Sequence, residues 1–154
     1  MMNLTGIPDK YAIYGMLFSV SNRLQTFGDK LFTDMTMKQH FLMISLGMFD
    51  QPPSLKEMAE INGSSYQNIK RMANQLEKAG YLKILPDSHD KRKQRLVSTG
   101  KFEELATALQ DVTANMMDTL FQGLSQEDLI TTLKTLVKMD QNLGGMMKIA
   151  ENQA

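Results

Sequence analysis

The chain contains no cysteine, which excludes disulfide bonds, thiolate metal sites, cysteine nucleophiles and sensing by thiol oxidation. Its two histidines are too few to make a closed zinc site on their own. Four prolines and ten glycines in 154 residues are too few for a collagen-like or low-complexity chain. Because 42% of the residues are hydrophobic, a disordered chain is also excluded, and we expect a folded protein near the size of one globular domain.

Long apolar runs are missing as well. No segment reaches the roughly 18 consecutive apolar residues that a membrane span needs, and the first nine residues lack the features of a signal peptide. The sequence therefore predicts a cytoplasmic protein with no membrane partner. It also lacks a Gly-rich phosphate-binding motif, a His pair at ligand spacing and a Gly-x-Ser-x-Gly motif. We accordingly expect no enzyme activity, no catalytic residue, no cofactor and no metal site.

Charge is unevenly distributed, although 17 basic and 17 acidic side chains cancel over the whole chain. Residues 1–53 are neutral, residues 54–99 carry a net charge of +4, and residues 100–154 carry a net charge of −4. A basic middle segment can place a positive face against a polyanion such as DNA. Many ordinary solvated surfaces have the same imbalance, so charge alone leaves both interpretations open.

Four hydroxyl side chains stand at expected helix starts, each three residues before Gln, Glu or Asp, as in a capping box. The pairs are Thr36 with Gln39, Ser54 with Glu57, Ser64 with Gln67, and Ser125 with Asp128. Together with the apolar periodicity, they predict helices over about 9–32, 37–49, 55–61 and 65–79, a long helix marked by Leu105 to Leu120, and a last helix ended by Gly144-Gly145.

After Gly80 the pattern changes from helical to extended. Residues 81–85 and 94–98 are short β-prone segments, and the polar loop 86–93 joins them into a hairpin. Two short helices followed by such a hairpin outline a winged helix-turn-helix. The expected fold class is therefore mainly α with a small β-hairpin wing (α+β), flanked by N- and C-terminal helices.

The helix expected over 65–79 has one apolar and one polar face. Ile69, Met72, Ala73 and Leu76 form a single stripe that we expect to be buried. Arg, Asn and Gln side chains can pair with base edges, whereas Lys and Ser side chains can hold phosphate. The predicted base-reading residues are Gln67, Asn68, Arg71 and Asn74, and the predicted backbone contacts come from Ser64, Ser65, Lys70, Arg92 and Lys93. An ordinary solvated surface is the alternative, but the helix carries no carboxylate before Glu77, which favours DNA.

Long amphipathic helices at both ends exceed what a minimal winged domain needs, so their apolar stripes must pack on each other or on a second chain. We expect a homodimer with residues 1–34 as N-terminal dimerisation helix, 35–99 as DNA-binding domain and 100–154 as C-terminal dimerisation helices, each chain being compact overall. Two recognition helices about 34–36 Å apart would then read an inverted-repeat operator in double-stranded DNA.

Several stretches together resemble the MarR family of bacterial transcriptional regulators over about residues 9–143. They are Met35-Thr36-Met37-Lys38-Gln39, Ser54-Leu55-Lys56-Glu57-Met58-Ala59, Asn68-Ile69-Lys70-Arg71 through Leu76-Glu77-Lys78-Ala79-Gly80-Tyr81, and Pro86-Asp87 followed by Asp90-Lys91-Arg92. The resemblance implies an intertwined dimer, with Arg92 entering a minor groove while Asp90 helps to hold it. Lys83-Ile84 replaces the family's acidic-basic pair in the first strand, which implies that a salt bridge often bracing the wing is absent.

The family resemblance also implies a small aromatic or phenolic effector bound between the winged domain and the dimerisation helices. The residues expected near that cavity are Tyr11, Tyr14, Phe18, His40 and Met43. The 14 methionines either fill the core or line an adaptable pocket, and His89 either contacts phosphate or lies in solvent. The predicted function is a transcriptional repressor released by an effector. The alternative, which the near-neutral total charge leaves open, is a winged-helix dimer that docks a protein instead of DNA.

Overall fold

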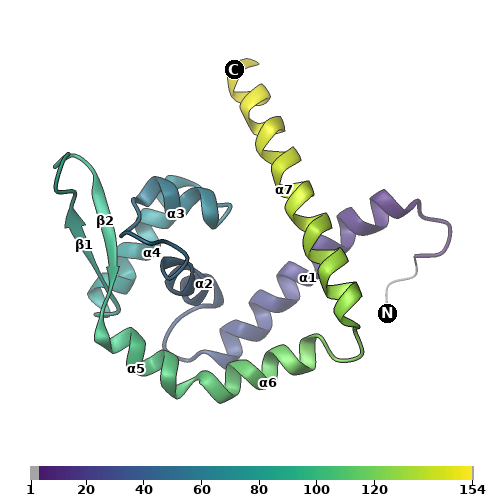
Figure 1. Ribbon diagram of the computed structural model, residues 1–154, viewed down its shortest axis with the longest axis horizontal. Coiled ribbons are helices and arrows are strands. Elements are labelled where there is room, and N and C mark those ends of the chain that lie inside the picture. The colour runs from purple at the N-terminus through teal and green to yellow at the C-terminus, as the bar shows by residue number, and fades with distance from the viewer. Residues whose placement is uncertain (1–3, 154) are drawn as a thin grey trace. The chain divides into compact units, whose positions relative to one another are not determined.

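The structure, a computed structural model, describes residues 4–153 of the chain (Figure 1). The elements in chain order are helices α1 (Asp9–Leu31), α2 (Met37–Leu46), α3 (Leu55–Ile61) and α4 (Tyr66–Lys78), strands β1 (Leu82–Pro86) and β2 (Gln94–Ser98), and helices α5 (Gly100–Ala108), α6 (Gln110–Leu120) and α7 (Gln126–Gln153). They form two compact units, Met1–Thr107 and Ala108–Ala154. The predicted fold class, mainly α with a small hairpin wing, is confirmed.

Capping boxes fix the starts of α2 and α3. The Thr36 hydroxyl accepts from the Gln39 N–H while the Gln39 side chain accepts from the Thr36 N–H, and Ser54 and Glu57 make the same pair of bonds. At α4 the predicted cap was one residue too early, because the Ser65 hydroxyl accepts from the Asn68 N–H instead. These caps place the first turns of three helices that surround the core of the winged domain.

The core of the first unit lies among α2, α3, α4, the hairpin and the start of α5. All four residues of the predicted α4 stripe are buried, and Leu42, Met43 and Met58 pack in the same cluster. Phe102, near the start of α5, is also buried in this cluster. Its ring therefore joins α5 to the core of the winged domain.

Strands β1 and β2 form an antiparallel hairpin in which Ile84 pairs with Leu96. The segment before α3 extends this hairpin, because Ser54 bridges Arg95 and the Leu96 N–H donates to the Pro53 carbonyl at 2.9 Å. On the other side, the Glu77 carboxylate of α4 accepts from the Ile84 N–H at 2.7 Å. The wing is thus tied to both helices of the helix-turn-helix.

Three helix boundaries differ from the sequence expectation. Helix α2 ends at Leu46, because the Gly47 N–H bonds in a tight turn to the Ile44 carbonyl. The helix expected through Leu120 is interrupted at Leu109 and becomes α5 and α6. Gly144-Gly145 does not end α7. A glycine inside a helix lowers its stability by only about 1 kcal/mol relative to alanine, and a helix as long as α7 tolerates that loss.

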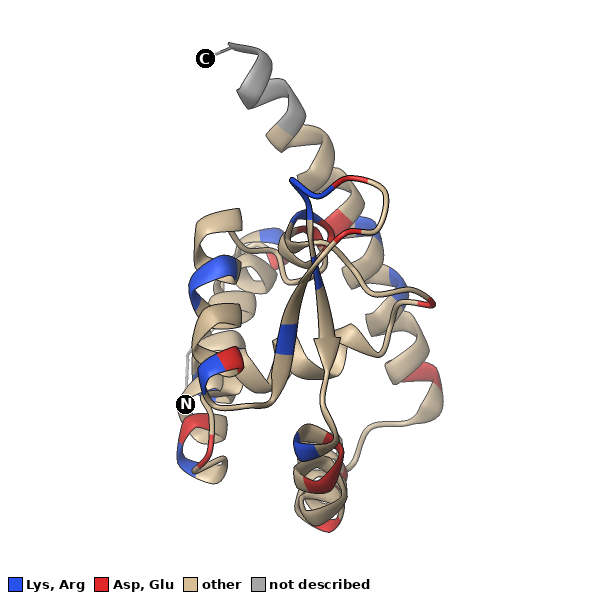
Figure 2. Cartoon of the chain, turned by 90° about the vertical axis from the view of Figure 1, so that its left-hand side faces the viewer, with Lys and Arg blue, Asp and Glu red and all other residues tan. Residues whose placement is uncertain are grey.

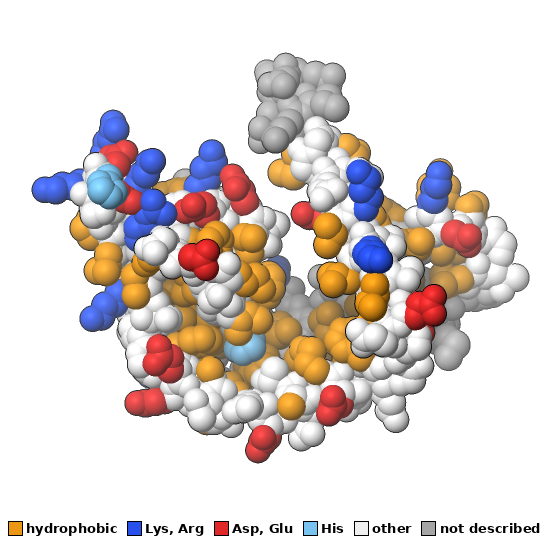
Figure 3. Space-filling view, viewed as in Figure 1, with side chains coloured by type: hydrophobic (Ala, Val, Ile, Leu, Met, Phe, Trp, Pro, Cys, Tyr) orange, Lys and Arg blue, Asp and Glu red, His pale blue; other side chains and the backbone are white. Residues whose placement is uncertain are grey.

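The second unit consists of α6, α7 and their connection, in which Gly123 has a φ of +82°. A box formed by Ser125 and Asp128 caps α7 at its start, as predicted. Many of the large apolar side chains of α7 are exposed, including Leu133, Leu136, Val137 and Leu143 (Figure 3). Across the described residues, no helix combines the length and the apolar character needed to cross a bilayer.

Candidate nucleic-acid interface

Helix α4 presents its predicted polar face to solvent. Gln67, Lys70, Arg71 and Asn74 are exposed, whereas the opposite stripe is buried. The carboxylate of α4, Glu77, is occupied by the backbone N–H of Ile84 and lies beyond these residues along the helix. The exposed face therefore offers amides and cations to a ligand without a neighbouring carboxylate that would neutralise them.

A chain of side-chain hydrogen bonds orients Arg71 on this face. Its Nη2 donates to Asn68 Oδ1 at 2.8 Å and its Nη1 donates to Gln75 Oε1 at 3.4 Å. Asn68 Nδ2 in turn donates to the Ser64 hydroxyl at 2.8 Å, and Gln39 Nε2 donates to Gln75 Oε1 at 3.1 Å. Asn68 is thus half-buried and engaged at both ends of its amide. It supports Arg71, and this arrangement lowers the entropy cost of ordering the guanidinium when a ligand binds.

Two of these supporting residues, Gln39 and Gln75, were not among the predicted site residues. Gln75 lies four residues after Arg71 on the same helix, so helical spacing was the available signal. Gln39 belongs to the start of α2 and reaches Gln75 from 36 positions earlier in the chain. No local pattern connects the two, so the sequence alone could not reveal this contact.

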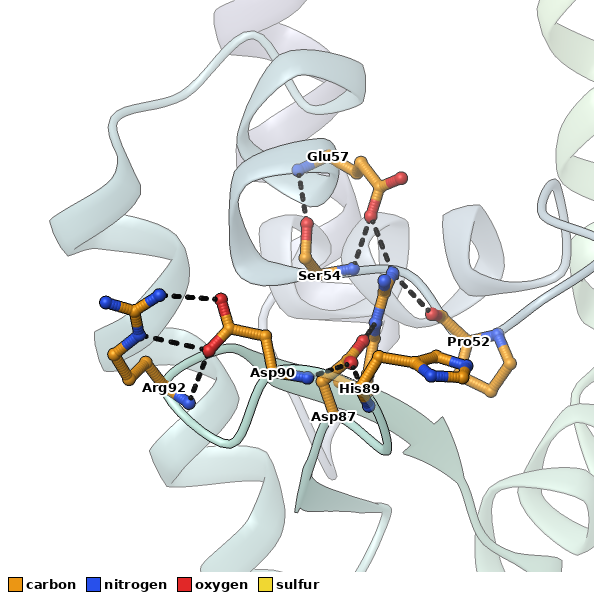
Figure 4. Close-up of polar contacts among 8 residues, drawn as sticks. Pro52, Ser54, Glu57, Asp87, His89, Asp90 and Arg92 are labelled. Atoms are coloured by element: carbon orange, nitrogen blue, oxygen red, sulfur yellow. Dashed lines mark hydrogen bonds and ion pairs between the residues drawn. The ribbon is translucent and has the colours of Figure 1, made fainter.

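The tip of the wing carries the predicted Asp90 and Arg92 pair. Arg92 Nε lies 3.1 Å from Asp90 Oδ1, and the Arg92 backbone N–H donates to the same oxygen at 3.1 Å (Figure 4). These hydrogen bonds from Arg92 lower the pKa of Asp90 below its ordinary value. Arg92 Nη2 also donates to Asp90 Oδ2 at 3.4 Å, yet the Arg92 side chain is 91% exposed to solvent.

The base of the wing loop is built around the buried Asp87 carboxylate. Arg95 Nε donates to Asp87 Oδ2 at 2.6 Å, and the N–H groups of His89 and Asp90 donate to Oδ1 at 2.8 and 2.9 Å. These bonds, first of all the one from Arg95, hold the pKa of Asp87 well below its ordinary value. Arg95 Nη1 also reaches Glu57 Oε2 at 3.1 Å and the Pro52 carbonyl at 3.2 Å.

The family resemblance implied that a salt bridge which often braces the wing is absent, but other salt bridges brace the wing here. The brace comes from β2 through Arg95, and not from the Lys83-Ile84 position of β1. Figure 2 shows basic positions on both strands and both signs of charge at the tip. Lys91 and Lys93 are exposed there, and basic side chains surround the tip in the space-filling view (Figure 3).

The residues expected near an effector cavity lie in two places within a single chain. Tyr11, Tyr14 and Phe18 are exposed on α1, whereas Met43 is buried in the core. His40 is also buried and stacks on Phe32, with ring centroids 4.1 Å apart. Since a helix rises about 1.5 Å per residue, Tyr11 lies roughly 30 Å along α1 from its end beside Phe32. One chain thus does not gather all five residues around one small molecule.

We expect His40 to make the fold sensitive to mild acid. Burial lowers the pKa of His40 below its ordinary value, and its Nδ1 has no hydrogen-bond partner among the described residues. The unfolded chain therefore takes up a proton first as the pH falls below about 6.5, and stability decreases with a slope of at most about 1.4 kcal/mol per pH unit. Urea unfolding at pH 5.5 and 7.5 measures this difference.

His40→Phe keeps a ring on Phe32 and removes the titrating group, so the loss of stability between pH 7.5 and 5.5 should shrink. The exposed His89 provides the matched control, and His89→Gln should leave the wild-type difference unchanged. A wild-type protein equally stable at both pH values would contradict this role for His40.

Solved structures of known proteins share this fold at low sequence identity. No protein-family profile matches the chain. A MarR/EmrR family transcriptional regulator from Acinetobacter sp. ADP1 superposes with a TM-score of 0.79 at 18% identity, over 94% of this chain and 99% of that one. For the S. aureus MepR-DNA complex the TM-score is 0.72 at 21% identity, over 84% and 97% of the two chains.

A third similar structure is that of BpsR from Bordetella bronchiseptica, which describes how 6-hydroxynicotinic acid regulates DNA binding. Its TM-score is 0.70 at 16% identity, and the match covers 83% of this chain and 98% of that one. Each of the three matches spans more than four fifths of this chain. This chain therefore has the winged-helix fold of the MarR-family transcriptional regulators.

Proposed function

We propose that this protein is a homodimeric transcriptional repressor that binds an inverted repeat in double-stranded DNA. The observation that carries the proposal is the exposed face of α4, where Arg71 is oriented by Asn68 and Gln75 and no free carboxylate opposes it. A bidentate guanidinium of this kind suits the guanine edge in the major groove. The exposed Arg92 at the wing tip suits the adjacent minor groove.

The remaining predicted contacts have defined tasks in this proposal. Gln67 and Asn74 are exposed beside Arg71 and would read neighbouring bases, while Lys70 and Lys93 would hold phosphates. Ser65 has its hydroxyl engaged in capping α4, so its contribution would come from the backbone at the helix start. The similar S. aureus MepR was solved as a complex with DNA, which supports this use of the fold.

The dimer is supported by apolar side chains that α1 exposes around its circumference. They are Tyr11, Ile13, Tyr14, Met16, Leu17, Phe18, Val20 and Phe27. A helix that is apolar on several sides is normally buried, so a second copy of the chain is the expected cover. The exposed apolar residues of α7, in the second unit, are likewise expected to be covered by a second chain.

Release from DNA is proposed to come from a small aromatic effector. The similar BpsR, whose DNA binding 6-hydroxynicotinic acid regulates, supports this ligand class. Tyr11 and His40 lie far apart within a single chain. If all the predicted residues take part, two chains would therefore have to form the site together. An effector that prefers a dimer with wrongly spaced recognition helices would lower operator affinity by population shift.

Arg71→Ala is expected to cost roughly 1–3 kcal/mol of operator affinity and to relax the preference for one base pair. The physical reason is the loss of a pre-oriented guanidinium from the base-reading face. Titration of the wild type and the variant against operator and random duplexes measures both effects. Equal losses on the two duplexes would reject base reading by Arg71.

Lys93→Ala is the matched control, because it removes a cation that we place on phosphate. It should weaken binding to every sequence similarly and reduce the slope of log Kd against log salt by about one. The same titrations at two salt concentrations test the function itself. A wild-type protein that binds DNA weakly and without salt dependence would instead favour the protein-docking alternative.

A further inference from the structure

We propose that Arg95 is the positioning residue of the wing, holding the hairpin tip against the start of α3 and thereby aiming Arg92 at DNA that Arg95 itself does not touch. This inference rests on the proposed DNA-binding function. It assigns different tasks to two arginines on one hairpin, only one of which is a DNA contact.

The first step is the bridge that Arg95 makes between separate segments. Its Nε donates to Asp87 Oδ2 in the wing loop at 2.6 Å. Its Nη1 donates to Glu57 Oε2 in the first turn of α3 at 3.1 Å and to the carbonyl of Pro52 at 3.2 Å. The planar fork of a guanidinium can reach these acceptors together, whereas a lysine ammonium presents a single point of charge.

The second step transmits this anchor to the tip. Asp87 Oδ1 accepts from the backbone N–H groups of His89 and Asp90, at 2.8 and 2.9 Å. The Asp87 N–H also donates to the Lys93 carbonyl at 2.9 Å, which closes the loop across its base. Asp90 then holds Arg92 through its carboxylate (Figure 4). A continuous series of contacts therefore runs from Arg95 through Asp87 and Asp90 to Arg92.

The third step concerns charge. Arg95 is 32% exposed and contacts two carboxylates, those of Asp87 and Glu57, so its charge is already compensated within the protein. Arg92 is 91% exposed and its guanidinium contacts one carboxylate, that of Asp90. If Arg95 left Asp87 to bind a DNA phosphate, the buried Asp87 carboxylate would lose its cation, which is unfavourable. Arg92 is thus the group available to DNA, and Arg95 is the group that supports it.

A double-mutant cycle on DNA tests this assignment. The duplex is one that the wild-type protein selects from a random-sequence pool, and the proteins are wild type, Arg95→Met, Arg92→Ala and the double variant. We expect Arg95→Met to raise Kd about tenfold in the wild type and to have no further effect in Arg92→Ala. Equal losses in both backgrounds would overturn the proposal, because Arg95 would then act independently of Arg92.

The salt dependence in the Arg92→Ala background separates positioning from direct contact. With Arg92 absent, Arg95→Met should leave the slope of log Kd against log salt unchanged. A slope reduced by about one would show that Arg95 itself holds a phosphate, and would also overturn the proposal. Lys83→Met, which removes an exposed cation from the other strand, is the matched control and should add its effect to that of Arg92→Ala.

A measurement without DNA distinguishes failure of this inference from failure of the proposed function. Heteronuclear NOE values of the backbone amides of residues 88–92 should fall in Arg95→Met and remain at wild-type values in Lys83→Met. Arg95→Lys, which keeps the charge, should behave as Arg95→Met does. Unchanged tip mobility in Arg95→Met would overturn the anchoring step. Absence of DNA binding by the wild type would overturn the proposed function and the aiming of Arg92, while the NOE values still decide the anchoring.

If Arg95→Met does not fold, Asp87→Asn provides the second route, because it keeps the arginine and removes the charge that it binds. Its effect on DNA binding should likewise disappear in the Arg92→Ala background. Amides of α4 serve as the internal reference in every NOE experiment, since they must keep their wild-type values for a change at the tip to be local.

Discussion

Ile69→Ala is expected to lower the free energy of unfolding by about 2–5 kcal/mol. Ile69 is completely buried at the centre of the α4 stripe and packs in the cluster that also contains Met58 and Leu42. Removing its side chain leaves a cavity that rigid neighbours from several elements fill only partly. Since small domains are typically stable by about 5–15 kcal/mol, the variant should unfold at a clearly lower urea concentration in circular dichroism.

The adjacent Lys70 supplies the matched control, because it lies on the exposed side of the same helix. Lys70→Ala should change the free energy of unfolding by no more than about 0.5 kcal/mol, yet weaken DNA binding and its salt dependence. Ile69→Ala protein that remains folded should keep a wild-type salt slope. If both variants lost equal stability, the assignment of buried and exposed faces on α4 would be wrong.

Local patterns were sufficient for most of the fold. The boxes of Thr36 with Gln39 and of Ser54 with Glu57 involve residues three apart, so their geometry depends little on the rest of the chain. The stripe beginning at Ile69 follows from helical periodicity for the same reason. Boundaries were less predictable: Ser64 and Ser65 are equally good caps by type, and only the completed turn decides between them.

The support of the candidate site could not be predicted, because it depends on contacts between distant segments. Arg95 meets Glu57 across 38 positions and Gln39 meets Gln75 across 36, so neither partner is visible from spacing. Sequence reasoning therefore identified the groups that face outward, such as Arg71 and Arg92, and the nearby Asp90 that holds Arg92. It missed the supporting residues Gln39, Gln75 and Arg95. This difference is expected wherever a polar side chain is oriented by tertiary structure rather than by its own helix.

The division into 1–34, 35–99 and 100–154 stays a prediction about function. The contacts within the chain instead separate Met1–Thr107 from Ala108–Ala154. In the proposed dimer, α1 would contribute to the interface although it contacts α2 within its own unit. A helix that serves both purposes can transmit the geometry of the dimer to the core beneath α4, which is what effector release requires.

Phe18→Glu is expected to dissociate the proposed dimer and to raise the apparent Kd for an inverted repeat by at least about 100-fold. Phe18 is 59% exposed on α1 and packs edge-on against Tyr14, with ring centroids 5.1 Å apart. A carboxylate at this position would have to be desolvated when a second chain covers it, which is strongly unfavourable. Without the partner, each chain would bind one half-site on its own. The gain from linking two half-sites, about 10²–10⁴ in affinity, would then be lost.

The control for this prediction is Arg23→Glu, which places the same carboxylate on α1 where an exposed charged side chain already stands. Sedimentation equilibrium should show Phe18→Glu as a monomer and Arg23→Glu as a dimer, while circular dichroism shows both to be helical. Binding of Phe18→Glu to a single half-site should remain at the wild-type level, because its α4 and wing are unchanged. Retention of a dimer with full operator affinity in Phe18→Glu would remove α1 from the interface, and the exposed apolar residues of α7 would then have to provide the contact alone.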